Sequence, residues 1–148
     1  MRKYLLGLLL TAGLVELISI IKNEKTDAQQ LIEVEHAFSK MCMEKGQKES
    51  FLYFMDDSGV LLRNNQYPLK GKAAKDFFAH SGIGPNVLSW EPTEAVIAKS
   101  GDLGYTYGTY LFRLSDTTVA GCYTTFWKKN AKGEWRFVLD TGTSGLPK

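Results

Sequence analysis

The pattern of apolar and polar positions predicts a long helix over residues 27–45. Its apolar residues recur at intervals of three and four and form one stripe: Leu31, Val34, Phe38, Met41 and Cys42. Four charged residues are expected largely off that stripe: Glu33, Glu35, Lys40 and Glu44. We expect Asp27 to cap the helix, because its carboxylate can accept hydrogen bonds from the free N–H groups of the first turn, and Gly46 to end it.

Shorter apolar runs, each bounded by turn residues, follow before residue 100. They predict a helix over residues 49–55, a strand over 60–63, a helix over 72–80, and a strand over 87–93 that continues over 94–99. Residues 56–59 are expected to form a turn between helix and strand. In the third helix we expect Ala73 and Phe77 to face inward, with Ala74 and Phe78 as further candidates.

Three aromatic-rich segments dominate residues 102–142 and read as consecutive antiparallel strands. They are GDLGYTYGTYLFRL, GCYTTFWKK and GEWRFVLDTG. Asp116-Thr117 and residues 130–133 are the expected hairpin turns. In the last strand the alternate residues Trp135, Phe137 and Leu139 should face the helices. Three helices followed by long antiparallel strands are typical of the α+β class, with helices on one face of a curved sheet.

The N-terminal segment resembles an export signal. Arg2 and Lys3 precede an apolar run over residues 4–15, and Glu16 interrupts its continuation. We therefore expect residues 1–28 to be a signal peptide and residues 29–148 to be the folded domain of an exported protein, periplasmic or extracellular. The alternatives are an uncleaved membrane anchor, in which Glu16 would be costly at the bilayer centre, and a helix that belongs to the fold.

The charge and the cysteine content limit the kinds of partner, metal and cofactor that we expect. The 18 basic and 16 acidic residues give a net charge of +2 without a basic stripe, so a nucleic-acid partner is not expected. Cys42 and Cys122 match no metal-binding spacing, and no metal or cofactor is expected. Two buried thiols are favoured; a disulfide and one reactive thiol are the alternatives.

Four blocks in this order resemble the NTF2-like superfamily, in its DUF4440/SnoaL-like branch. They are EKG at the end of the first helix, FMDDSGVLL, YPLKGKAAKDFFA, and the closing strands GDLGYTYGTYLF with FWKKNAKGEWRFVLDTG. The likeness covers residues 31–147. It implies a cone in which three N-terminal helices pack on a strongly curved, mainly antiparallel mixed sheet, as in cystatin-like folds and ketosteroid isomerases. It also implies a cavity at the wide end and, in many members, a homodimer formed through the outer sheet face.

Two residues are the first candidates for acid–base chemistry. Asp140 ends the last strand, where it either faces the cavity mouth or pairs with Arg113 or Arg136 on the outer face. His80 ends the third helix, where a cation suits the helix dipole, and in related folds that helix end lies near the cavity rim. No acid aligns with the isomerase catalytic positions, so no catalytic role is carried over.

Aromatic residues with a polar atom suit an apolar pocket that needs a few anchors. Most of them serve the core, and five residues are the candidates for ligand contacts: Tyr67, Trp90, Tyr107, Trp127 and Asp140. We therefore expect an exported domain that binds a small, mostly apolar molecule. The alternatives are an isomerase, cyclase or dehydratase that uses a cavity carboxylate or histidine, and a dimeric interaction module without a ligand.

Overall fold

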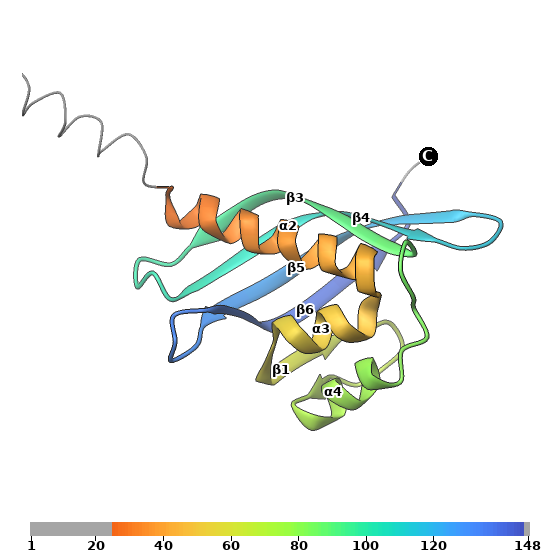
Figure 1. Ribbon diagram of the computed structural model, residues 1–148, viewed down its shortest axis with the longest axis horizontal. Coiled ribbons are helices and arrows are strands. Elements are labelled where there is room, and N and C mark those ends of the chain that lie inside the picture. Colours follow the sequence, from red (N-terminus) through yellow and green to blue (C-terminus); the bar gives the residue numbers. More distant parts are fainter. Residues whose placement is uncertain (1–24, 147–148) are drawn as a thin grey trace, which may run out of the picture.

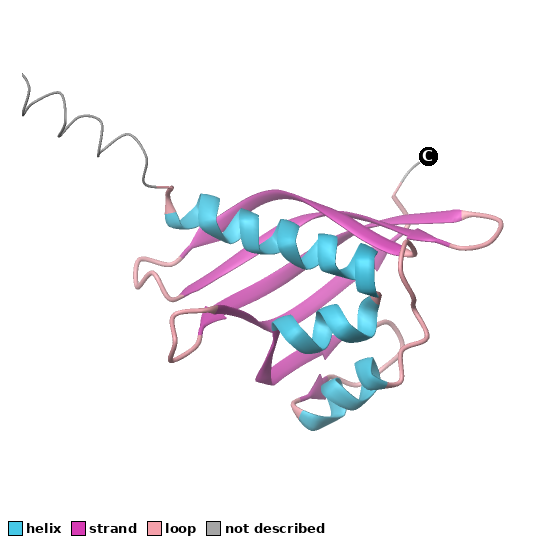
Figure 2. Cartoon of the chain, viewed as in Figure 1, coloured by secondary structure: helices cyan, strands magenta, loops and turns pink. Residues whose placement is uncertain are grey.

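The computed structural model describes residues 25–146 and consists of three helices packed on one face of a six-stranded sheet (Figures 1 and 2). The helices are α2 (Asp27–Lys45), α3 (Gln47–Phe54) and α4 (Lys72–Ala79). The strands are β1 (Met55–Leu62), β2 (Leu69–Lys70), β3 (Leu88–Ile97), β4 (Leu103–Arg113), β5 (Thr118–Lys129) and β6 (Trp135–Ser144). Their spatial order is β2-β1-β6-β5-β4-β3, and β1 pairs with β6 in parallel while the other pairs are antiparallel. The predicted α+β class and helix-covered mixed sheet are confirmed.

Helix α2 has the predicted bounds but a different cap. The cap is Thr26, whose side chain accepts from the backbone N–H of Gln29 while the Gln29 side chain accepts from the backbone N–H of Thr26. This reciprocal pair is a capping box, and it makes the expected cap at Asp27 wrong by one residue. Gly46 ends the helix as predicted: its φ is 87°, and a Cβ there would lie 2.9 Å from the backbone oxygen of Ile83.

The buried face of α2 centres on Phe38. Its ring lies 4.7 Å from the rings of Phe51 and Trp90 and 5.7 Å from that of Phe137, so this one side chain joins α3 to the inner face of the sheet. Glu35 is also fully buried on this face. The expectation that Glu35 lies off the apolar stripe is therefore wrong, because position 35 is one turn from Leu31 and one turn from Phe38.

The segments between α2 and β3 differ from expectation in detail. Helix α3 begins directly after Gly46, and β1 already begins at Met55. The predicted turn at residues 56–59 is an irregularity inside β1, in which the Asp56 carboxylate accepts from the backbone N–H and the hydroxyl of Ser58. In α4 it is Ala74 and Phe78 that are buried, whereas Phe77 is half-buried and Ala73 is exposed.

The closing strands have the predicted hairpins, and their register assigns the faces. Tyr123, Thr125 and Trp127 of β5 face the helices, and Tyr107 of β4 lies on the outer face. The backbones of β5 and β6 approach each other closely at Gly121, where a Cβ would lie 2.1 Å from the backbone oxygen of Thr143.

A bulge in β6 reverses the alternation of its side chains. Trp127 pairs with Phe137, but Phe126 pairs with Leu139, so Val138 is an extra residue. Trp135 and Phe137 face the helices as predicted, but beyond the bulge Asp140 takes the inward position that we expected for Leu139.

Both cysteines are free thiols in this structure, with Cys42 buried and Cys122 exposed. The expectation of two buried thiols is thus wrong for Cys122, which lies on the outer face of β5. No helix within residues 25–146 has the length and apolar character needed to cross a membrane. The predicted export segment lies outside the described residues.

Candidate functional site

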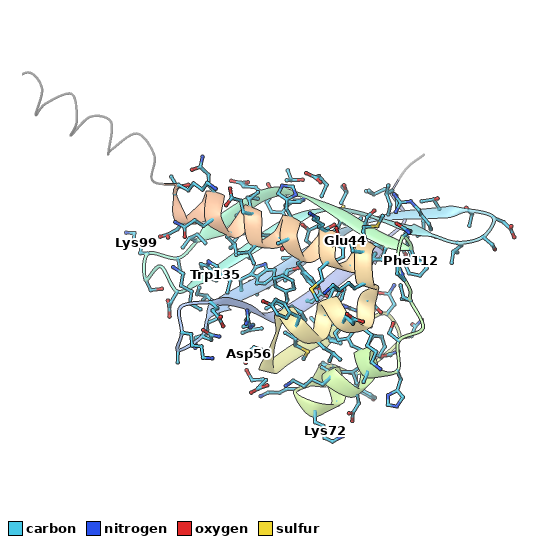
Figure 3. All side chains as sticks on the ribbon, viewed as in Figure 1. Glu44, Asp56, Lys72, Lys99, Phe112 and Trp135 are labelled. Carbon is cyan, nitrogen blue, oxygen red and sulfur yellow. The ribbon has the colours of Figure 1, made fainter. Side chains whose placement is uncertain are left out.

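A cavity of about 190 Å³ lies between α3 and the inner face of the sheet. Its apolar walls come from α3, β3 and β4: Phe51, Leu88, Trp90, Tyr110 and Phe112. Its polar side chains come from α3, β5, β6 and the residue after β1: Gln47, Tyr123, Thr125, Asp140 and Arg63. Figure 3 draws the side chains on the ribbon and labels Phe112 of this wall.

Asp140 and Arg63 form a largely buried ion pair in this cavity. Their side chains are 11% and 24% exposed. One carboxylate oxygen of Asp140 accepts from Nη2 of Arg63, and the other accepts from the Thr125 hydroxyl at 3.3 Å. Nη1 of Arg63 also donates to the backbone oxygens of Asp140 and Leu62, at 3.1 and 3.0 Å. The carboxylate and the guanidinium are therefore fixed in the wall by each other and by the sheet.

The geometry follows from strand pairing. Leu61 of β1 lies beside Asp140 of β6 in the parallel pair, and Arg63 follows two residues later on the same face. Thr125 of β5 lies directly opposite Asp140 on the other side. Three residues from distant parts of the sequence thus meet at one point of the sheet.

Tyr123 is the exceptional polar group of the cavity wall. Its side chain is 92% buried, since 8% of its surface is exposed. Its hydroxyl oxygen is buried without a hydrogen-bond partner among the described residues. Burial, together with the nearby acidic groups Glu35 and Asp140, raises the pKa of this hydroxyl, so it stays protonated and can donate. Buried hydroxyls nearly always have a partner, so this one indicates a place for a ligand or an ordered water.

Gln47 contributes a second oriented group. Its side-chain oxygen accepts from the Ser81 hydroxyl at 2.6 Å, which leaves the amide N–H groups as its remaining hydrogen-bonding capacity. The backbone of Gln47 is itself held by the oxygen of Ile83 at 2.9 Å. The segment after α4 therefore positions this edge of the cavity.

Glu35 lies behind the cavity and holds part of its wall. Its carboxylate accepts from the indole N–H of Trp90 at 2.5 Å, from that of Trp127 at 2.9 Å, and from the Thr106 hydroxyl. Ser39, one turn along α2, bonds both the N–H and the C=O of Trp90, at 3.0 and 2.7 Å. These contacts fix the Trp90 side chain and backbone, and with them one wall of the cavity.

Burial raises the pKa of Glu35 to about 7, against the opposing effect of the three hydrogen bonds. The charge of Asp140 adds to the rise. Loss of hydration outweighs three donors here because a fully buried carboxylate exchanges its whole water shell for them.

Similarity to solved structures identifies the fold of this protein. No protein-family model matches the sequence, and no curated protein matches it. Among solved structures, the chain is similar to a putative ketosteroid isomerase from Parabacteroides distasonis, with a TM-score of 0.67, 12% identity, and coverage of 84% of this chain and 96% of that one. The chain has an NTF2-like fold.

Two further structures support this assignment. A cystatin-like domain of unknown function from Nostoc punctiforme gives a TM-score of 0.65 at 17% identity, covering 84% of this chain and 81% of that one. A Mycobacterium tuberculosis protein in complex with estradiol-17beta-hemisuccinate gives 0.55 at 18% identity, covering 78% and 94%. At these identities the likeness concerns the NTF2-like fold and assigns no activity.

The structure brings two of the predicted ligand-contact residues to the cavity of this NTF2-like cone. Trp90 and Asp140 line it, and Asp140 pairs with Arg63 rather than with Arg113 or Arg136. Arg113 instead donates to the Ser89 hydroxyl, and Arg136 pairs with Glu134. The bulge before Asp140 is the reason, because it turns that carboxylate inward.

The other predicted residues lie elsewhere. Trp127 is fully buried in the core, where it bonds to Glu35. Tyr107 lies on the outer face and donates to Glu94 at 2.7 Å. Tyr67 is 92% exposed, in the loop that connects β1 to β2. His80 is exposed at the end of α4, with Nδ1 2.7 Å from the backbone oxygen of Asp76, and does not line the cavity.

Polar residues of the site and its support that were not predicted include Glu35, Gln47, Arg63, Tyr123 and Thr125. Glu35 is detectable from its spacing, four residues after Leu31 and three before Phe38. Tyr123 belongs to a strand whose alternation was recognised but whose inward face was not. Arg63 gave no local signal, because its role depends on the parallel pairing of β1 with β6.

A second hollow, between the start of α2 and β3, has a volume of about 580 Å³ but is a weaker candidate. It is an open depression bordered largely by exposed side chains, among them Glu33, His36 and Glu94. Within residues 25–146, no group of three His, Cys, Asp or Glu side chains is placed to hold a metal ion.

Proposed function

We propose that this protein binds a small, mostly apolar molecule in the cavity of its NTF2-like cone. The observation that carries the proposal is the Tyr123 hydroxyl, which is buried without a partner in a side chain that lines the cavity. An apolar pocket with a few fixed polar groups is the usual form of a small-molecule site. The M. tuberculosis protein in complex with estradiol-17beta-hemisuccinate supports the proposal, because it has the same fold.

Native mass spectrometry of protein purified from its own host tests this function. We expect a bound mass that is lost on denaturation and is depleted in Tyr123→Phe. Tyr105→Phe is the matched control, because Tyr105 lies on the outer face beside Phe126. Repeated recovery of wild-type protein with no bound mass, after gentle purification, would contradict the proposal.

Acid–base catalysis is the second candidate, and one observation favours it. The Asp140 carboxylate and the Tyr123 hydroxyl line the same cavity, so a general base and a hydrogen-bond donor are both available to a bound molecule. His80 does not line the cavity, so Asp140 is the residue to test. Once a ligand is identified, Asp140→Asn should abolish its turnover while retaining binding. If the wild type shows no turnover and Asp140→Asn only loses binding, the result counts against catalysis.

We also infer that two copies associate through the outer sheet face. That face carries exposed apolar side chains on β3, β4 and β5: Val96, Leu103, Tyr107, Leu111 and Phe126. Light scattering should give a dimer mass that Phe126→Asp reduces to a monomer, whereas Tyr67→Asp, in the exposed loop, should not. A monomeric wild type at high concentration would refute the interface. The presence of a cavity favours ligand binding over an interaction module with a filled cone.

We further propose that this protein is exported. Its membership of the DUF4440/SnoaL-like branch stays a prediction. The basic pair and apolar run of residues 2–15 support export, by cleavage near residue 28 or with retention as an anchor. Fractionation of the host together with the N-terminal sequence of the mature protein tests both alternatives. Recovery of the uncleaved chain in the cytosol would refute export.

A further inference from the structure

We propose that the cavity takes an uncharged molecule about the size of one substituted aromatic ring, which presents an oxygen acceptor to the wall. This inference rests on the small-molecule function proposed above. It adds the size, the charge and the hydrogen-bonding character of the ligand, each from a separate feature of the wall.

The size follows from the volume of the cavity. At about 190 Å³ it falls below the roughly 300–1,000 Å³ of pockets for drug-sized ligands. It is slightly larger than the roughly 150 Å³ engineered cavity that holds benzene. One ring with a small substituent therefore fits between the aromatic walls Phe51, Trp90 and Phe112, whereas a four-ring steroid exceeds this volume and would extend out of the cavity.

The polarity follows from which groups still need a partner. Both carboxylate oxygens of Asp140 already accept, one from Arg63 and one from Thr125. In contrast, the Tyr123 hydroxyl has no partner, and Gln47 has its oxygen engaged by Ser81, which leaves its N–H groups. The Tyr123 hydroxyl and the Gln47 N–H groups can both donate, so the complementary ligand brings an acceptor such as a carbonyl oxygen.

The charge follows from the pairing of Arg63. Its guanidinium is the only cationic group that lines the cavity in the described chain, and Asp140 neutralises it. Glu35 lies behind the wall and adds no positive charge. A carboxylate ligand would lose its hydration without gaining a free counter-charge, which is unfavourable. A cationic ligand could donate to the Tyr123 oxygen, but it would lose its hydration beside a carboxylate that Arg63 already neutralises.

A matched series of one-ring probes tests the inference on the full-length chain. Acetophenone, benzoate and benzylamine share the ring and differ in charge, and estradiol tests the size limit. We expect calorimetry to show acetophenone binding at least roughly tenfold more tightly than the other three. Tyr123→Phe should weaken acetophenone binding by roughly tenfold, which is the value of one hydrogen bond, and Tyr105→Phe should not.

Two substitutions of the ion pair should change the charge preference in opposite directions. Asp140→Asn leaves the Arg63 charge unpaired, so benzoate should bind at least roughly tenfold more tightly. Arg63→Gln leaves the Asp140 charge unpaired, so benzylamine should gain instead. Asp57→Asn is the control, since that exposed acid pairs with Lys75 and does not line the cavity. A thermal unfolding transition establishes that each variant is folded. One folded variant, either Asp140→Asn or Arg63→Gln, is enough for the test.

The outcomes separate this inference from the proposed function. Tighter binding of benzoate, benzylamine or estradiol than of acetophenone by the wild type overturns the ligand class while leaving small-molecule binding intact. An unchanged charge preference in a folded Asp140→Asn or Arg63→Gln variant also overturns it. Failure of all four probes overturns it as well, and the retained-mass experiment then decides separately whether the protein binds any ligand.

Discussion

Replacing Glu35 by Gln should remove the loss of stability that this carboxyl causes between pH 4.5 and 7. Glu35 is fully buried, and burial raises its pKa from 4.5 to about 7. The folded chain therefore holds this proton more tightly than the unfolded chain does. The resulting stabilisation is complete below pH 4.5, decreases as the pH rises, and is lost above about pH 7.

The size of the effect follows from the shift. Each pKa unit corresponds to about 1.4 kcal/mol, so a rise from 4.5 to about 7 makes the free energy of unfolding about 3 kcal/mol lower at pH 7 than at pH 4.5. For a domain of this size that is roughly 10 °C in Tm. Glu35→Gln has no proton to take up, so its unfolding free energy should lack this component.

Urea unfolding at a series of pH values measures the difference directly. The wild-type minus Glu35→Gln difference in unfolding free energy should fall by about 3 kcal/mol from pH 4.5 to 7, because the slopes of the other acids cancel in it. Glu33→Gln on the same helix is the matched control, since Glu33 is 54% exposed and pairs with Lys25. Parallel pH curves for the wild type and Glu35→Gln would refute the account of Glu35 as a carboxyl whose burial outweighs its three donors.

Three further predictions concern packing and capping. Gly121→Ala should lower the unfolding free energy by about 1–3 kcal/mol in urea, because its Cβ would lie 2.1 Å from a backbone oxygen of β6, whereas Gly82→Ala, with nothing within 4 Å, should change it little. In a Cys122→Ser background, Cys42 should resist alkylation until the protein unfolds, because burial raises its thiol pKa to about 11; rapid native labelling by mass spectrometry would contradict this. Thr26→Ala should cost about 1 kcal/mol in the same urea assay through loss of the capping box, and an unchanged midpoint would show that the cap is not stabilising.

The sequence was a good guide to the fold wherever the periodicity was unbroken. Helix α2 has its predicted bounds because its apolar stripe and terminal glycine act together. The two hairpins of the closing strands are also in their predicted places, since the aromatic segments are separated by residues suited to turns. The overall class followed from the order of these elements.

The site was less predictable, because it lies where periodicity is interrupted. Asp140 faces inward only because Val138 is an extra residue in β6, and a single bulge cannot be read from alternation. Its partner Arg63 is 77 residues away in the chain and reaches it through the one parallel strand pair. Tyr67 and Tyr107 are of a residue type that suits a pocket, but both lie on the surface. Tyr67 is in a loop, and the register of β4 turns Tyr107 outward.

Buried polar groups at these interruptions are informative because they carry a cost that apolar residues would avoid. The desolvation cost of Glu35 is offset in part within the fold, since two indoles and a hydroxyl on three strands donate hydrogen bonds to its carboxylate. That of Asp140 is offset through Arg63 and Thr125. Among the fully buried polar side-chain atoms of the described residues, only the Tyr123 hydroxyl lacks a partner, although a phenylalanine would fill the same space without an orphaned hydroxyl. Partners within the fold therefore satisfy Glu35 and the ion pair but not Tyr123, whose hydroxyl is left to pair with a ligand or an ordered water.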